Sequence, residues 1–252
     1  MKVSRREFVS TAGCAAAGLC ALPSFGFAAA YDSDARSGAC CTLLDLESNC
    51  ALPESLAGMR VALGGAHRRV TEIELGNAGQ VVVVPAAGAV RAGTFGVVAE
   101  LLERGATVLW ESGAAFLEPR DFAEQRALAL EHFGISMQQP IDVLPRCESR
   151  SASVESKNRG ARDMRAIGHE RVPYVAYRWP REAHVREFSR VIPVSAENGR
   201  AIAHWGDVSV AQRKPMGTGT LIFIGSPIGP ALRAGDPDAV SLLGAMIQVA
   251  AA

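Results

Sequence analysis

Residues 80–85 of the chain read Gln-Val-Val-Val-Val-Pro, and this stretch decides the fold class. An uninterrupted β-branched run is typical of a strand that is buried on both faces, as in a parallel sheet covered by helices. Pro85 cannot continue the strand, and the small residues 86–88 give the chain a tight exit. The stretch therefore predicts a central parallel strand.

The segments that follow alternate between helical and strand patterns. Residues 94–104 carry apolar side chains at helical spacing, and 107–110 read as the next buried strand. A second helix is predicted over 119–134, which opens on a proline and closes on a glycine, and another strand over 141–144. This alternation predicts an α/β domain of three layers, with a mainly parallel sheet flanked by helices.

Further segments on both sides extend this domain, which we expect to run from 57 to 252. Residues 60–65 read as a short strand that ends in a glycine turn. Two apolar runs around the Pro and Gly residues of 215–219 predict a carboxy-terminal hairpin, and Asp236 followed by proline predicts the start of a final helix. Residues 146–171 are rich in Arg, Ser and Gly and predict an irregular basic insertion.

The amino terminus has the three-part pattern of an export signal. Arg5 and Arg6 precede an apolar run, and small residues follow up to position 30. The paired arginines resemble the twin-arginine signal, so we expect residues 1–30 to direct the protein to the periplasm or outside the cell. Residues 31–56 form a polar, cysteine-bearing leader in this interpretation, with a short helix near 41–48.

The net charge bears on possible partners, and the cysteine content bears on disulfides and metal sites. The chain has 26 basic and 26 acidic side chains, so its composition gives no case for nucleic-acid binding. No membrane span is expected once the signal is removed. Of six cysteines, four lie beyond the signal. Outside the cytoplasm such thiols tend to form disulfides, for which three pairings are possible, and the alternative is that they are free structural thiols. Those four are Cys40, Cys41, Cys50 and Cys147. Because they lack Cys-x-x-Cys spacing, no metal site is predicted.

Common cofactor motifs are absent from the sequence. Gly217-Thr218-Gly219 lacks the third glycine of a dinucleotide loop and precedes a strand, which favours a hairpin turn. His169-Glu170 lacks the second histidine of a zinc-protease helix. No cofactor is therefore predicted. The aromatic segment 173–180 is either a core lid or a platform for sugar stacking.

The order of these segments resembles the class I glutamine amidotransferase-like fold. The resemblance covers 60–65, 81–85, 103–113 and the hairpin 217–226. Active members carry a cysteine in the turn at 111–113, where this chain has Glu-Ser-Gly, and no histidine stands in 225–229. The resemblance therefore implies a branch without amidotransferase activity, such as ThuA-like proteins or domains attached to bacterial glycoside hydrolases, with a flavodoxin-like sheet and a link to carbohydrate metabolism.

Three residues are candidates for catalysis, each with a structural alternative. Ser112 could be a nucleophile or a turn serine, and Glu111 could be an acid or base or a solvated loop carboxylate. His67 could bind substrate or metal, or be structural. Ligands of open α/β sheets bind at the carboxyl ends of the strands, which defines the expected ligand edge. That edge comprises Gly64, Gly65, Pro85, Gly113 and Ser226.

These observations favour a protein without catalytic activity over an enzyme. The main hypothesis is an exported, non-catalytic binding or accessory domain whose partner is a small molecule, a glycan or an envelope protein. The alternative is an exported hydrolase or carbohydrate-processing enzyme that uses Ser112, Glu111 or His67. A third hypothesis is a purely structural or assembly factor of the envelope.

Overall fold

The structure is a computed structural model that describes residues 41–46, 49–65, 67–143, 174–187 and 189–251. These residues belong to one compact unit. The signal, Cys40, Cys147 and the insertion at 146–171 lie outside the described residues. Among the helices described, none has the length and apolar character needed to cross a membrane.

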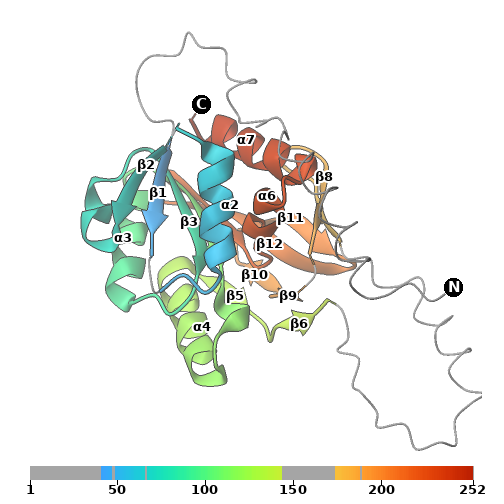
Figure 1. Cartoon of the computed structure of the whole chain (residues 1–252). Helices are drawn as coiled ribbons and strands as arrows, with labels where there is room; N and C mark the ends of the chain where they lie inside the picture. The colour runs from blue at the N-terminus through green and yellow to red at the C-terminus, as the bar shows by residue number, and fades with distance from the viewer. Residues whose placement is uncertain (1–40, 47–48, 66, 144–173, 188, 252) are drawn as a thin grey trace, which may run out of the picture. The chain divides into compact units, whose positions relative to one another are not determined.

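A nine-stranded sheet organises the domain (Figure 1). Its strands, in spatial order, are β2 (His67–Thr71), β1 (Cys41–Asp45), β3 (Val81–Ala87), β4 (Thr107–Ser112), β13 (Gly219–Ile224), β12 (Val208–Met216), β11 (Arg200–Trp205), β7 (Tyr174–Tyr177) and β8 (Ala183–Arg186). The first five are parallel to one another. From β13 to β8 every pairing is antiparallel.

The prediction of a mainly parallel, flavodoxin-like sheet is therefore wrong, because the sheet is mixed, with four parallel and four antiparallel pairings. The antiparallel half was missed because its strands β7 and β8 are short and alternate between buried and more exposed residues. Such strands lack the continuous apolar run that marks a buried parallel strand. The carboxy-terminal hairpin of β12 and β13 is confirmed.

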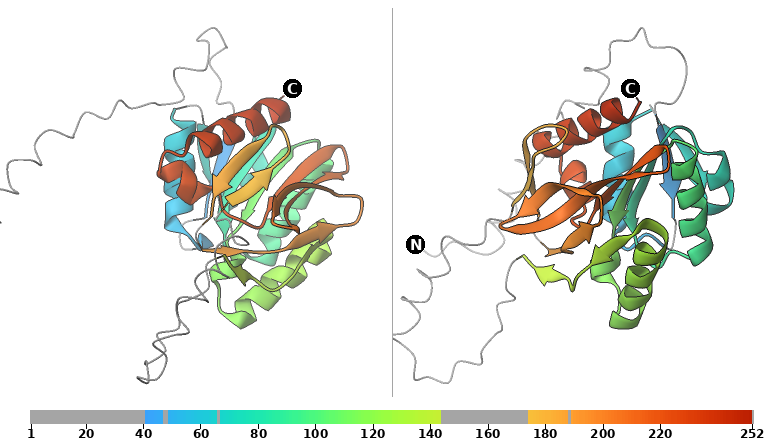
Figure 2. Two further views of the ribbon diagram at one scale, coloured as in Figure 1. Left: turned by 90° about the vertical axis from the view of Figure 1, so that its right-hand side faces the viewer. Right: turned by 180° about the vertical axis from the view of Figure 1, so that it is seen from behind.

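Helices cover both faces of the sheet (Figure 2). The contacts of two successive residues of β4 show which helices lie on which face. Trp110 packs against Phe95 of α3 (Ala92–Glu103) and Phe133 of α4 (Pro119–Phe133), with ring centroids 4.8 and 5.3 Å apart. The next residue, Glu111, faces Ser55 of α2 (Pro53–Leu63). Because successive strand residues point to opposite faces, α3 and α4 lie on one face and α2 lies on the other.

The remaining elements complete these layers. Helices α6 (Gly229–Arg233) and α7 (Pro237–Ala251) join α2 on its face, and α7 confirms the predicted final helix. Short 3₁₀ helices η3 (Glu72–Asn77) and η4 (Ala114–Phe116) follow β2 and β4. Two small antiparallel pairs lie outside the main sheet: β5 (Ile135–Met137) with β10 (Val194–Ala196), and β6 (Ile141–Asp142) with β9 (Arg190–Val191).

The beginning of the domain differs from the prediction. Residues 60–63 form the last turn of α2, not a strand, because a short apolar run fits either structure and Pro53 begins a helix upstream. The expected helix near 41–48 is also wrong, since Cys41–Asp45 is a buried strand, β1. The sheet therefore includes residues that the sequence assigned to the leader.

Candidate functional site

The carboxyl edge of the parallel strands gathers most of the residues that the sequence singled out. Strands β3, β4 and β13 run in the same direction and end at residues 87, 112 and 224. Pro85, Glu111, Ser112, Gly113 and Ser226 therefore lie at or just beyond one edge of the sheet. This edge is where open α/β sheets bind ligands.

Glu111 is fully buried at this edge, with a hydrogen-bond donor on each side of its carboxylate. The backbone N–H groups of Ala86 and Gly229 donate at 2.8 and 2.9 Å, and the Ser55 hydroxyl donates to the same carboxylate. Burial raises the pKa of Glu111, while hydrogen bonds from Ser55, Gly229 and Ala86 act in the opposite direction without reversing the shift. Glu111 is thus not the solvated carboxylate that its loop position suggested.

Ser112 is buried as well and lacks the surroundings of an activated nucleophile. Its side-chain oxygen accepts one long hydrogen bond, 3.4 Å from the backbone nitrogen of Ala114. Within the described residues no histidine or lysine is hydrogen-bonded to it. A hydroxyl without an adjacent base is a weak nucleophile, so the geometry fits the turn serine better than the catalytic one.

His67 and the two glycines before it lie at the opposite edge of the sheet. His67 is the first residue of β2 and pairs with Cys41, the first residue of β1. Gly64 and Gly65 follow the last turn of α2, next to the start of β2. The structure therefore does not bring His67 together with Ser112 and Glu111. The mismatch arises because 60–63 is helical, which carries the chain back to the amino edge before β2 begins.

A cavity of about 860 Å³ opens beside the carboxyl edge. Its walls come from the start of α2, η4, β7, β8, α6 and the loop that leads into α7. The side chains that line it include Phe116, Tyr174, His184, Arg186, Glu187 and Asp238. The volume falls in the range of ordinary small-molecule sites, and a mixture of aromatic and charged groups is typical of them.

Glu187 is the most firmly held of the polar residues that line the cavity. It is only 5% exposed, and Ser226 donates its hydroxyl to Oε2 at 2.8 Å. Ser189 donates its backbone N–H at 2.8 Å and its hydroxyl at 2.5 Å to Oε1. Ser226, which the sequence placed at the ligand edge, therefore contacts the cavity-lining residue Glu187 by a hydrogen bond.

Sequence reasoning missed most of the cavity residues. The Arg186 guanidinium lies over the Tyr174 ring, 5.8 Å from its centroid, and Asp238 accepts a hydrogen bond from the His184 backbone at 3.0 Å. Tyr174, His184 and Arg186 come from antiparallel strands that were not predicted, whereas Asp238 belongs to the predicted final helix. The aromatic segment 173–180 was the one part of the sequence that pointed to these residues. Its two tyrosines have different places, since Tyr177 is buried in the core and Tyr174 lines the cavity.

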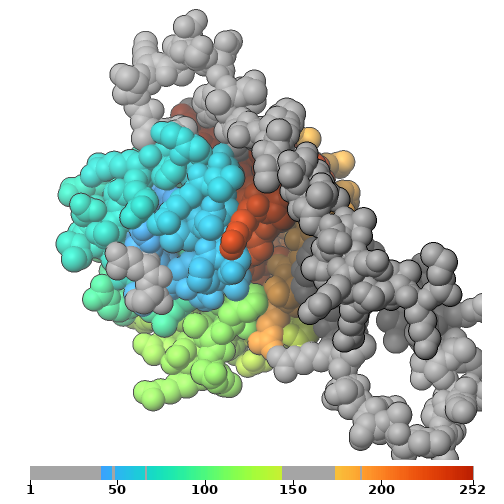
Figure 3. All heavy atoms as spheres, in the orientation of Figure 1, coloured from blue at the N-terminus to red at the C-terminus, as the bar shows by residue number. Residues whose placement is uncertain are grey.

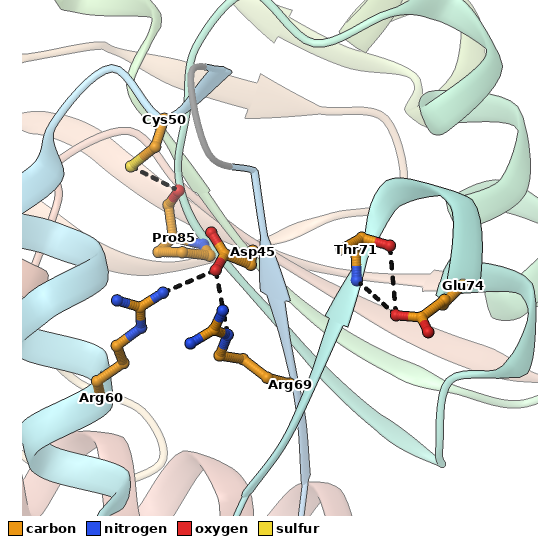
Figure 4. A network of polar contacts seen from close by, with 7 residues as sticks. All are labelled: Asp45, Cys50, Arg60, Arg69, Thr71, Glu74 and Pro85. Atoms are coloured by element: carbon orange, nitrogen blue, oxygen red, sulfur yellow. Dashed lines mark hydrogen bonds and ion pairs between the residues drawn. The ribbon is translucent and has the colours of Figure 1, made fainter.

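A second polar network joins β1, β2 and α2 (Figure 4). Asp45 binds Arg60 of α2 at 2.7 Å and Arg69 of β2 at 3.1 Å.

The free thiol of Cys50 donates to the carbonyl of Leu52 at 3.1 Å, and burial raises the pKa of this thiol. In the part of the chain that the structure describes, no cluster of His, Cys, Asp and Glu side chains is arranged to hold a metal ion.

Comparisons with solved structures find the same fold in much larger proteins. A β-galactosidase from Bacillus circulans sp. alkalophilus matches 84% of this chain with a TM-score of 0.53 and 16% identity, and that match covers 32% of its own length. The β-galactosidase from Rahnella sp. R3 gives a TM-score of 0.58 at 12% identity, covering 85% of this chain and 31% of that one.

An exo-β-1,4-mannosidase from Opitutaceae bacterium strain TAV5 is similar to a comparable extent, with a TM-score of 0.52 at 10% identity over 81% of this chain and 35% of that one. The chain thus spans about a third of the length of these structures. At these identities the likeness establishes the fold alone. No protein-family model and no curated protein sequence matches the chain.

Proposed function

We propose that this protein is an exported carbohydrate-binding protein and that its ligand occupies the cavity beside the carboxyl edge. The composition of that cavity carries the proposal. Sugars present an apolar ring face and a rim of hydroxyl groups, so they are recognised by aromatic surfaces combined with fixed charged groups. Tyr174 and Phe116 supply the aromatic surfaces, and Glu187 and Arg186 supply acceptors and donors.

The way these groups are held favours recognition of a hydroxylated ligand. Ser226 and Ser189 fix the Glu187 carboxylate, which reduces the entropy lost when it accepts a ligand hydroxyl. The Arg186 guanidinium lies over the Tyr174 ring, and this cation–π contact favours one arrangement of the two side chains. A pre-organised aromatic and charged surface of this kind binds a ligand without requiring any chemical step.

Two further observations support the proposal. The neighbours of known structure have names that refer to β-galactosidase and β-mannosidase, which are proteins that act on carbohydrates. The chain spans about a third of their length, so their complete activity is not assigned to it. The twin-arginine pattern at Arg5 and Arg6 supports export.

Calorimetric titration of the processed protein with β-1,4-galactobiose and β-1,4-mannobiose tests this proposal. We expect Tyr174→Ala to weaken binding about tenfold, as loss of an aromatic anchor does in other interfaces. Trp205→Ala is the matched control, because Trp205 is an aromatic residue of β11 that does not line the cavity. Equal affinities for the two variants, or no binding of either disaccharide by the unaltered protein, would count against the proposal.

Hydrolysis of a glycosidic bond in the same cavity is the second candidate, and the names of the structural neighbours favour it. Glycosidases generally use two carboxyl groups on either side of the bond that is cleaved. Glu54 and Glu187 both line the cavity and would be those groups, in place of Ser112, Glu111 and His67. Release of nitrophenol from nitrophenyl β-galactoside or β-mannoside, lost in Glu187→Gln, would favour hydrolysis over binding.

A further inference from the structure

Glu111 links the sheet to two helices that form a wall of the cavity. Its carboxylate lies at the end of β4 and accepts hydrogen bonds from Ser55 in α2 and Gly229 in α6. Glu111 is itself fully buried and does not line the cavity. The neighbouring residues Glu54 of α2 and Pro230 of α6 do line it. Glu111 therefore sits behind the wall and touches both of its parts.

The two helices are packed so closely that they behave as one unit. A Cβ atom on Gly58 of α2 would lie 1.9 Å from the carbonyl oxygen of Gly229, and one on Gly229 would lie 2.2 Å from the Ser55 hydroxyl oxygen. The space-filling view shows the α2 surface, in light blue, directly beside the red carboxy-terminal region (Figure 3). Whatever fixes one helix against the sheet therefore fixes the other.

We propose that Glu111 is the positioning residue of the cavity, and that its carboxylate holds the α2–α6 pair at the distance from the carboxyl edge that ligand binding requires. This inference rests on the proposed binding function. It assigns Glu111 a role in ligand affinity through α2 and α6, not through contact with the ligand.

A carboxylate suits this role because every neighbour is a donor. The Glu111 carboxyl group has acceptor lone pairs on both oxygens, which serve the Ser55 hydroxyl and the two backbone N–H groups of Ala86 and Gly229. A glutamine keeps the shape but turns an NH₂ group toward one of these donors. One buried N–H then loses its acceptor, which is more costly than the loss of an exposed hydrogen bond.

The test compares Glu111→Gln with Gln125→Ala. Gln125 is also buried and donates from α4 to the Val90 carbonyl at 2.8 Å, on the other face of the sheet. Both variants lose a buried hydrogen bond, but only Glu111→Gln disturbs the cavity wall. Measurements are made on the processed protein at a temperature where both variants are fully folded by circular dichroism.

Two readouts are needed. Hydrogen exchange followed by mass spectrometry should show faster exchange in Glu111→Gln at 53–63 and 229–233, and at neither segment in Gln125→Ala. The dissociation constant for the disaccharide that binds should rise about tenfold in Glu111→Gln and stay unchanged in Gln125→Ala. Unchanged exchange in the wall segments, or unchanged affinity at equal folded fraction, would overturn the inference.

Failure of the proposed function is distinguishable from failure of this inference. If the unaltered protein binds neither disaccharide, carbohydrate binding fails, while the exchange pattern still decides whether Glu111 holds the wall. If Glu111→Gln does not fold, Ser55→Ala replaces it, because it removes only the α2 donor to Glu111. Faster exchange in α2 together with weaker binding would support the inference, and wild-type values for both would overturn it.

Discussion

Gly58 of α2 packs directly against the backbone of Gly229 in α6, so that a Cβ atom on Gly58 would lie 1.9 Å from the Gly229 carbonyl oxygen. Both residues are buried in the described structure, and both stand behind the wall of the cavity. Close backbone approach of this kind requires glycine, because the overlap is with main-chain atoms that cannot rotate away.

Gly58→Ala should therefore destabilise the protein although alanine is the better helix former. The helix gains about 1 kcal/mol from the substitution. The overlap with Gly229 forces α2 and α6 apart, which typically costs about 1–3 kcal/mol in a well-packed core. Gly96→Ala in α3 is the control, since nothing lies within 4 Å of the Cβ it adds. Urea unfolding should show Gly58→Ala below wild type and Gly96→Ala at or slightly above it; the reverse order would contradict the packing.

Val83→Asp should abolish folding, whereas Val61→Asp should be tolerated. Val83 lies in β3 between two parallel neighbours and has no exposed surface, so an aspartate there would be an unpaired buried charge. Val61 is on the outer surface of α2 and is 65% exposed. Surface changes of this kind stay within about 0.5 kcal/mol. Thermal melts followed by circular dichroism make the comparison, and similar midpoints for the two variants would mean that β3 is not central.

The export prediction concerns residues outside the described structure. Replacing Arg5 and Arg6 by lysine should leave the precursor in the cytoplasm, because the planar guanidinium forks have a geometry that ammonium groups do not reproduce. Cell fractionation with an antibody against the protein measures the distribution. A processed product outside the cytoplasm in the double variant would rule out the twin-arginine route.

The sequence predicted the central strands β3, β4 and β13 of the parallel half and the helices beside them because their signals are local, whereas β1 and β2 were missed. Val81–Val84, Thr107–Trp110 and the helix that begins at Pro119 are continuous apolar or capped segments, and each lies in an element of the predicted type. The strand ends were predicted too early, since β3 continues through Pro85 to Ala87 and β4 continues to Ser112. The antiparallel half depends on pairing between distant segments, such as Tyr174 with Arg186 and Ala203 with Tyr177. A short strand with alternating burial forms because it pairs with another strand, so its own residues do not predict it.

The sequence predicted where the carboxyl edge of the central strands lies, but not which residues line the cavity beside it. The carboxyl edge followed from the direction of the parallel strands, and Ser226 does lie there. His67 was placed at the wrong edge because the apolar run before it was taken for a strand. The burial of Glu111 could not be foreseen either, because its donors Ser55 and Gly229 are separated from it by 56 and 118 residues.

The buried Glu111 carboxyl should make stability depend on pH in a defined direction. Burial raises its folded-state pKa above the ordinary value of 4.5, against the opposing hydrogen bonds. The folded state therefore binds this proton more tightly than the unfolded state does. As pH rises from 4.5 through the folded-state pKa, the unfolded chain ionises first and the contribution of Glu111 to stability falls. The glutamine of the Glu111→Gln variant has no ionisable proton at this position.

In urea unfolding between about pH 4 and 8, wild type should therefore lose stability relative to the variant as the pH increases. A difference that does not vary with pH, or that grows in favour of wild type, would mean that the Ala86, Gly229 and Ser55 donors outweigh burial.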